Sequence, residues 1–102
     1  MSALLQRQLE FARKFSILTY WMLNEGMTWK VGRGLCCELC SKPTSLHRLS
    51  LAEDILLFVD GVYQKENEQY RQIGEKWESI GGAWGGQWGD GNHISLEWEG
   101  RR

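Results

Sequence analysis

The chain has 102 residues, of which 42% are hydrophobic, 12% aromatic and 25% charged. This length suits one compact domain, because a chain of this size buries about two-thirds of its unfolded surface and cannot build a second core. The aromatic and aliphatic content excludes a disordered chain, and the net charge of −1 excludes a long-range attraction to nucleic acid or anionic lipid.

The sequence carries no recognisable membrane or secretion signal. No run approaches the about 20 apolar residues that a membrane helix needs, and polar residues already interrupt residues 1–10. The three cysteines, Cys36, Cys37 and Cys40, are clustered, unlike the even and dispersed set of a secreted disulfide protein. We therefore expect synthesis in a reducing cytoplasm, no signal peptide and no membrane insertion.

The first 24 residues carry apolar side chains at steps of three, four and seven, the period of one helix face. These residues are Leu4, Phe11, Phe15, Leu18 and Met22. Ser2 is a suitable N-cap and Gly26 a suitable stop. The spacing predicts a core-packing helix over about residues 3–24.

Two strands are predicted in the middle of the chain. Residues 28–31 alternate weakly and suit a short strand. Residues 55–59 form a continuous apolar run that is closed by Asp60 and Gly61, a turn signal. This run predicts a buried strand that reaches a tight turn.

The last third of the chain predicts a helix, a glycine-rich loop and a strand. Tyr70, Ile73, Gly74 and Trp77 recur at helical spacing within residues 66–77. Six of the eleven residues from 81 to 91 are glycine, and residues 93–98 alternate as in a strand. Without an internal repeat or a linker, the elements predict one mixed α+β domain over residues 1–102.

The two histidines each have an acidic residue at a spacing that suits a metal site. Asp54 follows His47 by seven residues, and Asp90 precedes His93 by three. Asp54 stands directly before the apolar run, where an unpaired charge is costly and a divalent cation removes that cost. Three protein ligands with a fourth position open are typical of catalytic zinc. His47, Asp54 and His93 supply such a set for one Zn²⁺.

A catalytic zinc site also needs a base. Zinc lowers the pKa of a bound water from about 15.7 to about 7, and a nearby carboxylate can take its proton and pass it to a leaving amine. Asp90 is the first candidate, because a glycine-rich loop can bend its carboxylate toward the metal. Glu97 is the rival, because positions 93, 95 and 97 share one face of a strand. Spacing alone also fits a plain surface hydrogen bond between each His–Asp pair.

Two segments resemble a family of zinc peptidases that cleave peptidoglycan peptides. Residues 45–54, S-L-H-R-L-S-L-A-E-D, match the motif S-x-H-x-x-G-x-A-x-D of D-alanyl-D-alanine carboxypeptidases and bacteriophage L-alanyl-D-glutamate endopeptidases. W-G-G at 84–86 and D-G-N-H-I-S-L-E at 90–97 resemble segments of phage endolysins in that family. The resemblance covers residues 45–100 well and the N-terminal helix loosely.

The resemblance implies a fold and a set of roles. The fold is a small α+β domain of the Hedgehog/DD-peptidase-like kind, in which an antiparallel sheet bears the zinc. The metal ligands would be His47, Asp54 and His93, and the general base Asp90, while Glu97 takes a structural role. The implied substrate contact is Arg33, matched to the family's oxyanion or substrate arginine. Ser45 and Trp88 are further candidates for substrate binding: Trp88 could stack on glycan or stem peptide, or it could be a packing residue that supplements a thin core.

Several residues depart from the family pattern or have a second interpretation. Ser50 replaces the motif's glycine, which a modest backbone adjustment would accommodate, and Trp98 replaces a histidine that is frequent in endolysins. Cys37 and Cys40 could join His47 in a zinc knuckle, or they are free thiols in a loop. We expect Trp84 to be structural and the two final arginines, Arg101 and Arg102, to be a solvated tail.

The expected function is therefore that of a hydrolase, a zinc metallopeptidase of phage endolysin type that cuts the peptidoglycan stem peptide, with L-Ala–D-Glu as the expected bond. The alternatives are a D-Ala-D-Ala carboxypeptidase and a non-catalytic relative that binds wall peptide. We expect a monomer made in the host cytoplasm that acts in cell-wall degradation and host lysis after release, or that is carried on the virion.

Overall fold

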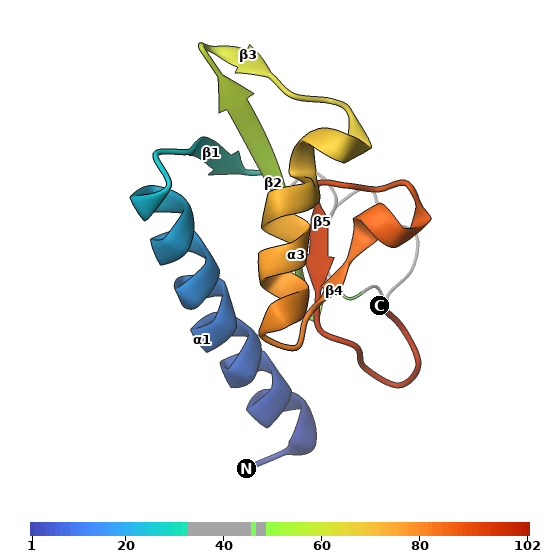
Figure 1. The fold of residues 1–102 in the computed structure, drawn as a ribbon. Coiled ribbons are helices and arrows are strands. Elements are labelled where there is room, and N and C mark those ends of the chain that lie inside the picture. Colours follow the sequence, from blue (N-terminus) through green and yellow to red (C-terminus); the bar gives the residue numbers. More distant parts are fainter. Residues whose placement is uncertain (33–45, 47–48) are drawn as a thin grey trace.

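The computed structural model describes residues 1–32, 46 and 49–102. Its helices are α1 (Ala3–Asn24) and α3 (Arg71–Ser79), with short 3₁₀ turns η1 (Asn67–Tyr70) and η2 (Gly85–Trp88). Its strands are β1 (Thr28–Val31), β2 (Ala52–Val59), β3 (Val62–Tyr63), β4 (Ala83–Trp84) and β5 (His93–Ser95) (Figure 1). The predicted α+β class is confirmed.

Helix α1 begins and ends where the sequence predicts. The Ser2 side chain caps it by accepting a hydrogen bond from the Leu5 amide at 3.1 Å. Gly26, with φ +76°, follows its end, a conformation that glycine adopts without strain. Leu18 and Phe11 are buried, and the Phe11 ring meets Trp77 of α3 edge-on at 5.5 Å between centroids. The two helices lie side by side over the core (Figure 1).

The sheet is antiparallel in the order β1-β2-β5-β4, and β3 pairs with β2 as a hairpin. The hairpin turns at Asp60 and Gly61, whose φ values of +50° and +79° are those of a type I′ turn. Strand β2 pairs with three neighbours and thereby connects the hairpin to the end of the sheet that carries β5. This confirms the antiparallel sheet that the family resemblance implies.

Three element boundaries differ from the prediction. Strand β2 begins at Ala52, before the apolar run, because its first three residues pair with β5. The predicted helix over residues 66–77 is split into η1 and α3. Strand β5 ends at Ser95, although the Leu96 amide still donates to the Leu51 carbonyl at 2.9 Å in the register of β2 and β5. Trp98 then forms an isolated bridge with Arg101 instead of continuing the strand.

Among the described residues, neither α1 nor α3 combines the length and the apolarity that crossing a bilayer requires.

Candidate active site

Asp54 and His93 lie directly opposite each other on β2 and β5. Cross-strand partners in register present their side chains on the same face of the sheet. His93 Nδ1 and Asp54 Oδ1 are 3.7 Å apart, and the two side chains are only 9% and 24% exposed. The pairing continues one residue further, where the Ile55 amide donates to the Asn92 carbonyl at 2.7 Å. The structure thus brings together two of the three predicted metal ligands.

The chemistry and spacing of this pair fit zinc. Imidazole nitrogen and carboxylate oxygen are common zinc ligands, and two ligands of one tetrahedral ion stand about 3.4 Å apart. The distance of 3.7 Å between Nδ1 and Oδ1 is close to that separation. Within residues 1–32, 46 and 49–102, no group of three possible metal ligands is present. His47, the predicted third ligand, lies outside the described residues.

Backbone hydrogen bonds hold Asp90 beside His93. The Asp90 amide donates to the Gly85 carbonyl at 2.8 Å, and the Asp90 carbonyl accepts from the His93 amide at 3.0 Å. A Cβ atom on Gly85 would stand 2.2 Å from the Asp90 carbonyl oxygen, so glycine is needed for this approach. Gly85 therefore allows the backbone to pack closely around the candidate base.

The two tryptophans of this loop have different surroundings. Trp84 is buried, and its indole Nε1 donates to the Gly91 carbonyl at 2.7 Å, which confirms the predicted structural role. Trp88 is 44% exposed, and its ring centroid stands 5.7 Å from that of His93. Its indole therefore forms part of the surface beside the candidate metal ligand.

Arg102 is exposed, as predicted for a solvated tail, but both final arginines also make contacts. The Arg102 guanidinium lies over the Trp88 ring, 5.4 Å from its centroid, and Arg101 forms an ion pair with Glu99 at 3.6 Å. A cation over an indole face gains electrostatic attraction to the ring. Arg102 is thus brought next to the candidate site through Trp88, a contact that no local sequence pattern indicates.

A polar cavity of about 140 Å³ adjoins Asp90, lined in part by Lys65, Asn67 and Asn92. Tyr70 also lines it, and its hydroxyl accepts from the Leu57 amide at 2.9 Å and donates to the Gln64 carbonyl at 2.8 Å. Burial raises the pKa of the Tyr70 hydroxyl above its ordinary value, so the group is a neutral donor at neutral pH. Sequence reasoning missed these lining residues, because they come from segments far apart in the chain.

A sequence model described as D-alanyl-D-alanine carboxypeptidase matches residues 40–96, more than half of the chain. The chain belongs to the D-alanyl-D-alanine carboxypeptidase family. Peptidases of this family are generally zinc-dependent and act on peptidoglycan, which indicates a hydrolase of the metallopeptidase class. A search of curated proteins found no match.

Several residues that the sequence marks as candidates are not placed by the structure. Arg33, Ser45 and the three cysteines lie outside the described residues, as His47 does. Glu97 is described and exposed, beyond the end of β5. Its carbonyl accepts from Arg7 Nε of α1 at 3.1 Å. Glu97 is therefore not aligned with His93 on a strand, and the premise on which it rivalled Asp90 is wrong.

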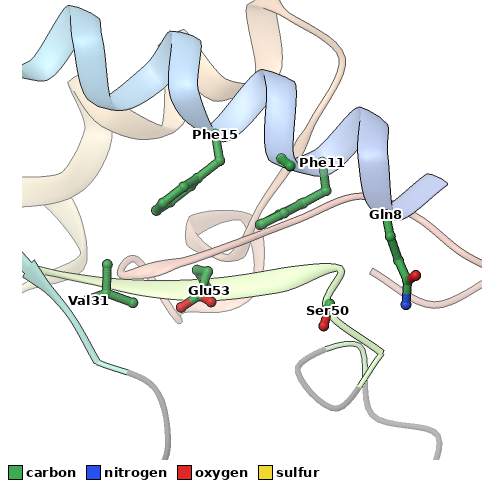
Figure 2. Close-up of a pocket in the computed structure, with 7 residues that line it drawn as sticks. Gln8, Phe11, Phe15, Val31, Ser50 and Glu53 are labelled. Atoms are coloured by element: carbon green, nitrogen blue, oxygen red, sulfur yellow. The ribbon is translucent and has the colours of Figure 1, made fainter. Parts of the chain in front are cut away.

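A larger cavity, of about 330 Å³, lies between α1 and β2. Figure 2 shows Phe11 and Phe15 of α1 pointing toward the strand, on the same side as Glu53. Because side chains alternate along a strand, Glu53 and Asp54 face opposite sides of β2. This cavity is therefore distinct from the site that carries the family's predicted metal ligands.

Proposed function

We propose that the chain is a zinc-dependent peptidoglycan peptidase of the bacteriophage endolysin type, which hydrolyses the L-Ala–D-Glu bond of the stem peptide. The observation that carries the proposal is the Asp54–His93 pair, 3.7 Å apart, beside a loop that holds Asp90. Membership of a family of zinc peptidases supports the chemistry. The resemblance of residues 84–86 and 90–97 to endolysin segments supports the choice of bond.

Different residues of the chain would bind the metal and transfer the proton. His47, Asp54 and His93 would hold the zinc ion. When bound, zinc supplies a Lewis acid for the scissile carbonyl and lowers the pKa of the attacking water. Asp90 accepts the proton of that water and passes it to the leaving amine. The two backbone hydrogen bonds at Asp90 fix the backbone position from which its side chain extends. A fixed position reduces the reorganisation that the reaction needs.

Substrate contacts are proposed for three further residues. Trp88 offers an exposed indole face next to His93, suited to packing against a stem peptide or a sugar ring. Arg33 would bind the substrate or the developing oxyanion as a cation, and Ser45 would bind the peptide by hydrogen bonding.

Digestion of purified peptidoglycan tests the proposal. The walls are treated with the chain alone, with a chelator, and with zinc restored, and the fragments are identified by mass spectrometry. We expect new D-Glu amino termini that vanish with the chelator and return with zinc. Cleavage that a chelator leaves unchanged would contradict the zinc requirement, and new termini at another bond would contradict the specificity.

A D-Ala-D-Ala carboxypeptidase is the second candidate, favoured by the description of the matching family. The same digestion separates the two, because a carboxypeptidase releases free D-Ala and leaves the L-Ala–D-Glu bond intact. If a folded, zinc-loaded chain cleaves no wall type tested, the function is instead that of a non-catalytic module that binds wall peptide.

We also propose that the chain reaches the wall after release from the host cytoplasm rather than as part of the virion. Immunoblots of purified virions and of lysed host cells test this. Detection in the lysate alone supports release, and detection in washed virions would establish the virion-associated alternative.

A further inference from the structure

The cavity beside Asp90 lies between two segments that are distant in sequence. One is the chain from β3 to η1, which contributes Lys65 and Asn67, and the other is the turn that carries Asp90 and Asn92. The cavity measures about 140 Å³, enough for a small polar group but not for a sugar ring with its substituents.

Its walls are held by side chains and close backbone contacts. Asn67 Nδ2 donates to the Gly86 carbonyl at 3.2 Å, which ties η1 to η2. A Cβ on Gly91 would stand 2.8 Å from Asn67 Oδ1, so these two segments touch directly. The Tyr70 hydroxyl, bonded to Leu57 and Gln64, anchors η1 to β2. The cavity is therefore preformed, and a ligand would not have to order it.

The lining of the cavity contains two charged residues among those described, the cation Lys65 and the anion Asp90. Lys65 is exposed and, among the described residues, makes no ion pair, unlike Lys14, whose ammonium meets Glu10 at 2.8 Å. An ammonium group beside a polar cavity can form charge-assisted hydrogen bonds with an anionic group of a ligand. Asn92 and Tyr63, whose side chains carry neutral hydrogen-bond donors, belong to the same lining.

We propose that this cavity is the subsite for the free carboxylate on the leaving side of the scissile bond, with Lys65 as its cationic partner. The inference rests on the proposed function, in which Asp90 passes a proton to the scissile nitrogen. In the L-Ala–D-Glu segment, D-Glu continues through its side-chain carboxyl, so its α-carboxylate is free. That carboxylate is attached to the carbon that carries the scissile nitrogen. A nitrogen placed at Asp90 therefore brings the carboxylate to the adjoining cavity.

The same chemistry applies to the second candidate reaction. In a terminal D-Ala-D-Ala bond, the leaving residue also carries a free carboxylate on the carbon next to the scissile nitrogen. The subsite therefore recognises a feature common to both substrates, and the identity of the cleaved bond is set elsewhere. The subsite discriminates against a leaving residue whose carboxylate is amidated or esterified.

Two matched peptides test the subsite on the zinc-loaded full chain. The first is L-Ala-γ-D-Glu-L-Lys, and the second is identical except that the D-Glu α-carboxylate is amidated. We expect kcat/KM to be about tenfold higher for the carboxylate peptide, the size of one charge-assisted hydrogen bond. Lys65→Met should bring the ratio of the two values close to one, whereas Lys65→Arg should keep most of the preference. Lys30→Met, on the exposed edge of β1, is the control and should keep the wild-type ratio.

Calorimetric binding of the same two peptides separates failure of the subsite from failure of the proposed function. If neither peptide is cleaved but the carboxylate peptide binds more tightly through Lys65, the cavity binds a carboxylate and only the proposed reaction is wrong. Equal cleavage and equal binding of the two peptides by the wild-type chain overturn the subsite. A preference that survives in Lys65→Met overturns it as well.

Discussion

Ser50 occupies a backbone conformation that explains the glycine of the family motif. Its φ is +58°, in the left-handed region, where a side chain costs about 1–2 kcal/mol. The expected backbone adjustment is therefore wrong, because Ser50 keeps a conformation suited to glycine. We predict that Ser50→Gly stabilises the fold by about 0.5 kcal/mol, the strain relieved less the added freedom of the unfolded chain. Urea unfolding measures this, and Ser50→Ala, which retains the Cβ, should show no gain.

Asp90 lies in the loop that leads into β5, and His93 is the first residue of that strand. Their substitutions should nevertheless have separable effects. Asp90→Asn removes the base but no proposed ligand, so we predict normal zinc content and turnover lowered about 10²- to 10⁴-fold. His93→Ala should lose both zinc and activity. Metal analysis and turnover are measured on the same preparations, with Asp60→Asn in the hairpin turn as the control. An active Asp90→Asn protein, or a fully metallated His93→Ala protein, contradicts the corresponding role.

At the scale of elements, α3 packs on β4 through a glycine. A Cβ on Gly74 would stand 2.0 Å from Cδ2 of the Trp84 indole, which is buried and hydrogen-bonded to Gly91. In an exposed helix, alanine is favoured over glycine by about 1 kcal/mol. Here we predict the opposite sign, because Gly74→Ala overpacks the interface and should cost about 1–3 kcal/mol in unfolding free energy. The control is Gln72→Ala on the exposed side of α3, which should be nearly neutral.

The connection between β2 and η1 depends on the hydroxyl of Tyr70. Tyr70→Phe leaves the Leu57 amide without its side-chain acceptor, and we predict a loss of about 1–3 kcal/mol near neutral pH. Burial raises the pKa of Tyr70 in the fold, so the hydroxyl's contribution is complete below about pH 10, the pKa of an unfolded tyrosine. It should decline as the pH rises through the raised folded pKa.

Urea unfolding of the wild type and of Tyr70→Phe on both sides of about pH 10 checks the pH dependence. The difference in unfolding free energy between the two proteins should shrink at the higher pH. Tyr20→Phe, at an exposed position on α1, should show no such change. A constant difference would mean that the hydroxyl does not titrate differently in the folded and unfolded chains.

At the scale of the whole molecule, the elements governed by local rules were predictable and the contacts between them were not. The helix over residues 3–24 follows from its apolar spacing and the Ser2 cap, which act within one turn. The start of β2 depends on pairing with β5, about forty residues away, so the apolar run alone missed it. The residues lining the cavity at Asp90 meet only through the fold. The Asp54–His93 pair was predicted from the spacing and chemistry of the two His–acid pairs, and family resemblance, which carries long-range information that periodicity lacks, selected the same residues.

One hydrophobic core joins α1, the sheet and α3, which predicts that the chain unfolds as the single domain expected from its length. Leu18 of α1 is fully buried, so Leu18→Ala should cost about 2–5 kcal/mol. Because Trp77 and Trp84 are buried in the same core, tryptophan fluorescence and far-ultraviolet circular dichroism should shift to a lower urea midpoint together. Leu23→Ala, at a residue 65% exposed, is the matched control and should change little. If helix signal were lost before tryptophan signal in Leu18→Ala, α1 would be a separately unfolding unit and the site would survive on the sheet alone.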